Sequence, residues 1–151
     1  MKKLILLFVL IAVAKISYSQ KPGQDKNNVD KWNFSVEQGS PGEATLVFKL
    51  KMDKGWHVYS QNTPDGGPLP MVYKFDPKDC YELIGKCIEP KPEEEYDSTF
   101  MLKVFIFNGE VTFRQKVKVK SNCKIHGTIE YQVCKDACIF KSTTFDLDVK
   151  K

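Results

Sequence analysis

Two cysteines near the C-terminus, Cys134 and Cys138, flank a three-residue polar turn. Apolar side chains occupy every second position from 125 to 133 before the turn, and from 145 to 149 after it. This alternation predicts two half-buried β-strands joined as an antiparallel hairpin. Opposed residues of such a hairpin have Cα atoms about 4.5 to 5.5 Å apart, which suits a disulfide. Cys134 and Cys138 can therefore bond at the hairpin tip.

A disulfide that closes so small a ring removes little entropy from the unfolded chain, so it stabilises the fold only weakly. At a hairpin tip it is exposed to thiolates, as exchange-active disulfides are. Lys135 favours a thiolate here and Asp136 opposes one, which leaves the direction of a pKa shift open. The spacing alone supports redox exchange and a structural disulfide in a secreted domain equally.

The same alternation runs through most of the chain. It predicts strands at residues 32–36, 44–52, 71–75, 81–87, 104–107 and 111–119, the fifth of them buried on both sides. Asn108-Gly109 predicts a tight hairpin, and the Pro- and Glu-rich stretch Glu89–Glu95 predicts a surface loop. Seven to nine short strands without a convincing helix predict an all-β, immunoglobulin-like antiparallel β-sandwich.

Two parts of the chain resemble a known family. Residues Gly127 to Asp136, followed by Cys138, are similar to the Tyr-Gln-x-Cys-x-Asp hairpin of the N-terminal periplasmic domain of thiol:disulfide interchange protein DsbD. The segment Gly55 to Pro70 resembles the same domain. The resemblance implies an immunoglobulin-like sandwich whose cysteine pair passes electrons to periplasmic partners. It also implies that Cys138 attacks a partner's disulfide and that Cys134 resolves the mixed disulfide.

The resemblance also assigns residues around the cysteine pair. An aromatic side chain at the position of Tyr59 stands beside the pair in that family, whereas His57 occupies a position that can be tyrosine. A lone histidine is more often structural, although its near-neutral pKa suits proton transfer. In that family an aromatic side chain in a loop caps the cysteine pair. Tyr96 matches this aromatic residue best, with Phe100 as the alternative. The expected surroundings of Cys134 and Cys138 are His57, Tyr59, Glu94, Glu95, Tyr96, Phe100, Tyr131, Gln132 and Asp136.

The sequence departs from the family pattern in two places. Family members often have four or five residues between the cysteines and a Pro-Pro pair soon afterwards, whereas here three residues intervene and Ile139-Phe140-Lys141 follows. The sequence ends at Lys151, where the full-length family protein continues into a membrane-embedded electron conduit and a thioredoxin-like domain. We therefore expect thioredoxin-fold or other periplasmic thiol proteins as partners, a separate membrane electron donor, and no cofactor or metal.

The N-terminus predicts export. Residues 1–19 read as a signal peptide, with two lysines before an apolar run and small residues before a cleavage site at Gln20. Residues 20–30 read as a flexible leader, and residues 31–151 as one domain.

The composition argues against two classes of partner. Three of the 23 basic residues lie in the signal peptide, which leaves 20 against 19 acidic residues. This balance gives no basic excess for nucleic acid, and no later stretch is suited to stable membrane insertion.

The other cysteines leave alternatives open. In one extended strand, Cys80 and Cys87 would lie about 23 Å apart on opposite faces, so we expect buried or half-buried free thiols. Cys123 and His126 form a possible zinc site with the cysteine pair, although they lie more than about 20 Å away along the preceding strand.

A non-catalytic, immunoglobulin-like binding module is a further alternative. Its partners would bind at the loop tips, and the Cys134–Cys138 disulfide would be structural.

Overall fold

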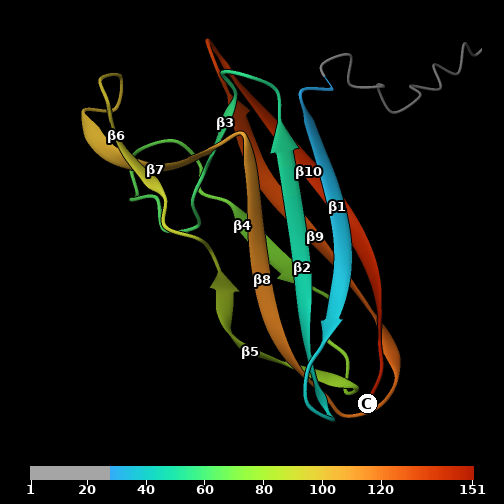
Figure 1. Cartoon of the computed structure of the whole chain (residues 1–151). Coiled ribbons are helices and arrows are strands. Elements are labelled where there is room, and N and C mark those ends of the chain that lie inside the picture. The colour runs from blue at the N-terminus through green and yellow to red at the C-terminus, as the bar shows by residue number, and fades with distance from the viewer. Residues whose placement is uncertain (1–27) are drawn as a thin grey trace, which may run out of the picture.

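Residues 28–151 are described by the computed structural model, and they form two antiparallel β-sheets packed face to face (Figure 1). The predicted signal peptide, residues 1–19, and leader residues 20–27 lie outside the described residues. The prediction of an all-β, immunoglobulin-like sandwich is confirmed. The strands are β1 (Asp30–Gln38), β2 (Glu43–Met52), β3 (His57–Tyr59), β4 (Val72–Phe75), β5 (Tyr81–Ile88), β6 (Glu93–Asp97), β7 (Leu102–Asn108), β8 (Glu110–Val119), β9 (Cys123–Cys134) and β10 (Cys138–Val149).

One sheet has the strand order β1-β2-β8-β5, and the other has the order β10-β9-β3-β7-β6, with β4 also paired to β9. The short strand β3 pairs with residues 133–134 of β9, and β4 pairs with residues 127–130. Strand β3 therefore separates the β9–β10 hairpin from the β6–β7 hairpin. No helix able to cross a bilayer occurs in residues 28–151.

The core lies between the sheets and is built from alternate positions of their strands. Its fully buried side chains include Leu46, Phe48, Leu50, Val58, Phe113, Val117, Ile125, Ile129 and Val133. Burying each such side chain contributes about 1.5 to 3 kcal/mol relative to leaving it in water. A glycine is required at position 127, because an added Cβ would lie 2.4 Å from the Lys74 carbonyl oxygen and 2.4 Å from the Phe145 ring.

Two local predictions are wrong. Asn108-Gly109 does not close a hairpin, because β7 belongs to the six-stranded sheet and β8 to the four-stranded sheet. Gly109 adopts a φ of 64°, and its carbonyl oxygen accepts a hydrogen bond of 2.7 Å from the Met52 N–H.

Residues Glu93–Asp97 form β6 rather than a loop. The prolines precede this strand, and its charged side chains suit the exposed edge of a sheet.

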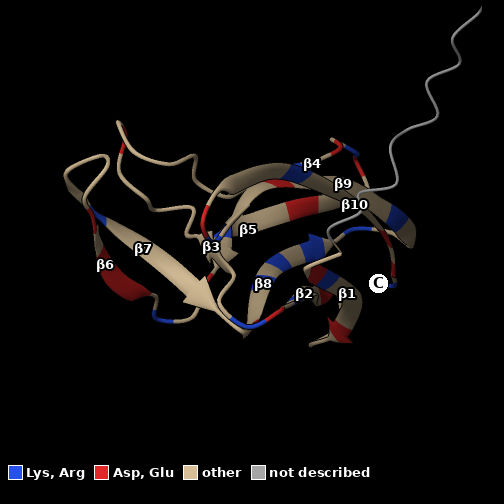
Figure 2. Cartoon of the chain, turned by 90° about the horizontal axis from the view of Figure 1, so that it is seen from above, with Lys and Arg blue, Asp and Glu red and all other residues tan. Residues whose placement is uncertain are grey.

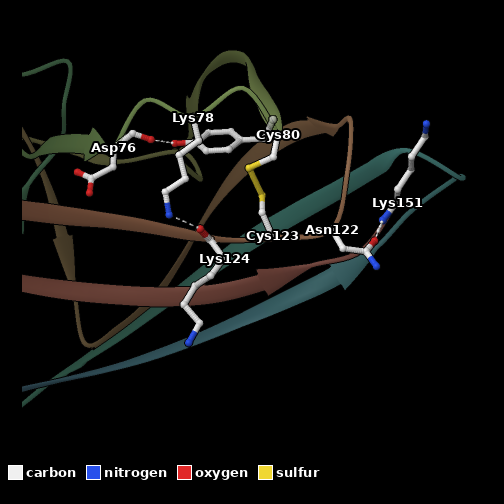
Figure 3. Close-up of a disulfide and its surroundings, with 8 residues drawn as sticks. Asp76, Lys78, Cys80, Asn122, Cys123, Lys124 and Lys151 are labelled. Carbon is white, nitrogen blue, oxygen red and sulfur yellow. Dashed lines mark hydrogen bonds between the residues drawn. A yellow bond between two sulfur atoms is a disulfide. The ribbon is translucent and has the colours of Figure 1, made fainter.

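The prediction of a free thiol at Cys80 is also wrong, because Cys80 forms a disulfide with Cys123 (Figure 3). Cys80 directly precedes β5 in one sheet, and Cys123 begins β9 in the other, so the bond links the two sheets. Close by, the Lys78 ammonium donates a hydrogen bond of 2.8 Å to the Lys124 carbonyl oxygen. Cys87 is a buried free thiol, as predicted, and burial raises its pKa to about 12.

Candidate redox site

The cysteine pair lies at the tip of the β9–β10 hairpin. Cys134 and Cys138 are opposed in the strand register, with Cα atoms 4.1 Å apart, and they form a disulfide. Their environments differ, because Cys134 is only 2% exposed whereas Cys138 is exposed to solvent. The strand register places β9 residues 123 and 134 eleven positions apart, so the tip lies about 36 Å from the Cys80–Cys123 disulfide. A reactant from solvent therefore meets Cys138 first.

A small apolar cluster supports the buried half of this disulfide. Tyr59, Val104 and Ile106 pack with Cys134 in a cluster separate from the main core. Side chains alternate along a strand, and the neighbours Val58 and Phe107 belong to the main core. The cluster therefore lies on the outer face of the six-stranded sheet. The alternation at positions 104 and 106 was visible in the sequence, but their proximity to the cysteine pair was not.

Strand β3 places a histidine and a tyrosine beside the pair. His57 is opposed to Cys134 in the strand register, and its Nε2 forms a hydrogen bond of 3.2 Å with the Tyr59 hydroxyl. Burial lowers the pKa of His57, against the opposing influence of Glu95 and Asp97. Burial, Asp97 and Glu95 all raise the pKa of Tyr59. Both side chains are therefore uncharged at neutral pH.

A carboxylate from the other sheet fixes the chain immediately after β3. Glu89 accepts a hydrogen bond of 2.5 Å from the Ser60 hydroxyl through one oxygen, and one of 3.0 Å from the Gln61 N–H through the other. Glu89 follows β5, so these bonds connect the two sheets and fix the position of Tyr59. The sequence carried no signal for this role, because Glu89 falls in a stretch that reads as a surface loop.

The β6–β7 hairpin projects from one edge of the six-stranded sheet (Figure 1), and residues of its turn line the same hollow as the cysteine pair. Its turn begins at Asp97, whose Oδ1 accepts hydrogen bonds from the backbone N–H groups of Thr99 and Phe100, at 2.8 and 3.1 Å. Two aromatic side chains on the hairpin remain largely exposed, Tyr96 at 62% and Phe100 at 44%. Residues 93–108 make up this β6–β7 hairpin.

The two hairpins and β3 line an open hollow of about 370 Å³. Eight of the predicted site residues line it, namely Cys134, Cys138, His57, Tyr59, Glu95, Tyr96, Phe100 and Asp136. Asp97 and the small residues of the two turns also line the hollow and were not predicted, whereas Lys135, which also lines it, was expected to influence the cysteine pair.

Three predicted residues lie elsewhere. Glu94 is paired with Lys103 at 3.5 Å on the exposed surface. Tyr131 is buried between the sheets, where its hydroxyl donates a hydrogen bond to Asp30. Gln132 accepts a hydrogen bond of 2.7 Å from the Leu69 N–H. These side chains do not contribute to the hollow.

The structure does not assemble the alternative zinc site. Its three cysteines are held in disulfides, Cys123 with Cys80 and Cys134 with Cys138. His126 lies 3.0 Å from the Asp146 carboxylate through its Nδ1. Within residues 28–151, no group of three or more acidic, histidine or cysteine side chains is placed to hold a metal ion.

Fold and site together define the chain as an immunoglobulin-like β-sandwich with a disulfide in an open hollow at a hairpin tip. Residues 26–150 match the family model described as "Thiol:disulfide interchange protein DsbD, N-terminal". The chain therefore belongs to this family, and the resemblance in the cysteine hairpin is confirmed. No curated protein matches the sequence significantly.

Solved structures of related domains share the fold. The N-terminal periplasmic domain of ScsB from Proteus mirabilis matches with a TM-score of 0.64 and 16% identity, over 83% of this chain and 49% of that chain. The chain thus spans about half the length of that ScsB chain. The reduced DsbD N-terminal domain of Neisseria meningitidis matches with a TM-score of 0.51 and 18% identity, over 80% of this chain and 85% of that chain.

A further match is a complex between the DsbD and PilB N-terminal domains of Neisseria meningitidis. It has a TM-score of 0.57 and 17% identity, and covers 80% of this chain and 84% of that chain. At sequence identities this low, the structural matches establish a common fold and nothing more.

Proposed function

We propose that this domain exchanges disulfides with thiol proteins outside the cytoplasm through Cys134 and Cys138. The observation that carries the proposal is the pairing of an exposed Cys138 with a buried Cys134 in an open hollow. Exposed disulfides are accessible to thiolates, and access governs the rate of exchange. Membership of the DsbD N-terminal family supports a role in thiol-disulfide exchange.

In the reduced domain, the Cys138 thiolate attacks one sulfur of a partner's disulfide, and the partner's other sulfur leaves as a thiolate. The Cys134 thiolate then attacks Sγ of Cys138 in the mixed disulfide and releases the partner's second thiolate. The partner thus gains two electrons and takes two protons from solvent, and the domain becomes oxidised. His57 and Tyr59 add uncharged hydrogen-bonding groups beside Cys134.

We infer partners of the thioredoxin-fold class, or other thiol proteins of the periplasm. The Neisseria DsbD N-terminal domain has been solved in complex with the PilB N-terminal domain, and the ScsB domain is described as periplasmic. We further propose that a separate membrane protein returns electrons to the pair, and that residues 1–19 direct export.

The reduction potential of the pair tests the proposed function. Structural disulfides usually lie below about −300 mV, so we expect the Cys134–Cys138 pair to lie above that value. The measurement equilibrates the protein with glutathione buffers and quantifies each disulfide by peptide mapping, with Cys80–Cys123 as the internal reference. A potential below about −300 mV for Cys134–Cys138 would favour a binding module with a structural disulfide.

We propose that Tyr96 and Phe100 cap the cysteine pair and slow its reaction with stray thiols. Replacing both with alanine is expected to speed reduction of Cys134–Cys138 by dithiothreitol about threefold to tenfold, because access to the sulfur increases. The matched control is Met101→Ala, since Met101 lies in the same turn, is 77% exposed and does not line the hollow. Equal rates in the double variant and the control would contradict the cap.

A further inference from the structure

The hollow around the cysteine pair has an acidic rim. The side chains of Glu95, Asp97 and Asp136 line it, and among its lining residues in the described chain the only lysine or arginine is Lys135. Figure 2 shows the concentration of acidic residues on β6. Within residues 28–151, none of the three carboxylates forms an ion pair, whereas the neighbouring Glu94 is paired with Lys103. The rim therefore carries an excess of negative charge.

The field of Glu95 and Asp97 reaches two other side chains of the hollow, His57 and Tyr59. Burial lowers the pKa of His57, and Glu95 and Asp97 partly offset that lowering; burial raises the pKa of Tyr59, and the same two carboxylates raise it further. Charged side chains on an edge strand prevent it from pairing with another chain, and this role would be met by charges anywhere along β6. That role does not account for carboxylates that line the same hollow as Cys138 from two separate hairpins.

We propose that Glu95, Asp97 and Asp136 select the reactants of Cys138 by charge. A thiol with cationic neighbouring groups is favoured over one with anionic neighbours. The preferred partner then carries lysine or arginine around its reactive cysteine. This inference rests on the proposed exchange function and names the kind of partner that it serves.

Three small thiols act as probes because they differ in charge beside the sulfur. Glutathione carries an excess negative charge, 2-mercaptoethanol none, and cysteamine a positive one. In each case the thiolate attacks Sγ of Cys138, and the Cys134 sulfur leaves as a thiolate that takes a proton from solvent. A second thiolate then attacks the small molecule's sulfur in the mixed disulfide, which leaves the domain as a dithiol and forms the oxidised small thiol.

The test variant combines Glu95→Gln with Asp97→Asn. Asparagine keeps the Oδ1 that accepts the hydrogen bonds from Thr99 and Phe100, so the turn is preserved. The charge-matched control combines Glu43→Gln with Asp148→Asn. Asp148 lies ten positions along β10 from Cys138, about 33 Å away, and Glu43 begins β2.

The reduction rates are compared at an ionic strength of about 10 mM and normalised to thiolate concentration. At this ionic strength charges interact over about 30 Å. The test variant is expected to react about fivefold to tenfold faster than wild type with glutathione, about threefold faster with 2-mercaptoethanol, and at an unchanged rate with cysteamine. At 1 M salt these differences should vanish, and the control variant should match wild type throughout.

Each other outcome overturns a defined claim. Equal acceleration with all three thiols would mean that the substitutions open the hollow, and unchanged rates would mean that the rim exerts no selection. Either result removes the charge selection and leaves the exchange function standing. If none of the three thiols reduces Cys134–Cys138 in the wild-type protein, both the exchange function and the selection are overturned.

Discussion

Replacing Cys138 with serine is expected to slow the reaction of the reduced domain with a disulfide at least a hundredfold. The remaining cysteine of the pair, Cys134, is only 2% exposed and packs in an apolar cluster, so a reactant cannot approach it from solvent. Cys87 does not compensate, because burial raises its pKa to about 12 and leaves almost no thiolate at neutral pH.

The complementary variant, Cys134→Ser, is expected to trap the intermediate. Cys138 attacks as before, but no second thiolate is present to resolve the mixed disulfide. With the uncharged disulfide 4,4′-dithiodipyridine, the reduced wild-type domain should release two thiopyridones and retain no label. Cys134→Ser should release one and retain the other thiopyridyl group on Cys138 as a mixed disulfide, as measured by absorbance and by mass spectrometry.

The control for both variants is Cys87→Ala, which should behave as wild type. Peptide mapping confirms in each sample that Cys80–Cys123 stays oxidised. If Cys134→Ser retains no label while Cys138→Ser reacts at the wild-type rate, the assignment of Cys138 as the attacking residue is wrong. In the presence of a protein partner, the same Cys134→Ser variant should form a covalent complex through Cys138.

Replacing Cys80 and Cys123 with alanine is expected to lower the free energy of unfolding by about 4 kcal/mol. The sequence separation of 43 residues sets the size of the effect, since a longer closed loop removes more entropy from the unfolded chain. The bond also connects the two sheets at the end of the sandwich remote from the Cys134–Cys138 hairpin tip. Urea denaturation followed by fluorescence measures the difference.

The Cys134→Ala/Cys138→Ala variant provides the matched comparison. The disulfide that it removes joins residues only four positions apart, so the same entropy argument gives a decrease of about 2 kcal/mol in the free energy of unfolding. On the proposed function, Cys80–Cys123 is the stabilising disulfide and Cys134–Cys138 is the disulfide used for exchange. A larger loss from the hairpin pair than from Cys80–Cys123 would contradict this division.

Local sequence patterns predicted most of the strands because a half-buried strand shows its buried face in every second residue. The pattern at positions 125–133 and 145–149 predicted β9 and β10, and the short turn brought Cys134 opposite Cys138. The same reasoning failed at Asn108-Gly109. A turn motif describes the local backbone, whereas the choice between pairing and crossing to the other sheet depends on contacts far away in the sequence.

The sequence by itself determined the β-sandwich, the cysteine hairpin and the candidate residues His57, Tyr59 and Tyr96, since each rests on periodicity, short spacing or family resemblance. Only the tertiary structure decided that Cys80 bonds to Cys123, that β6 forms a sheet edge, and that three carboxylates line the same hollow as Cys138. These features join segments tens of residues apart. Their proximity follows from the order of the strands in the two sheets. Hydrophobic alternation shows which side of a strand is buried but is the same for every strand order, so it does not predict which segments become neighbours.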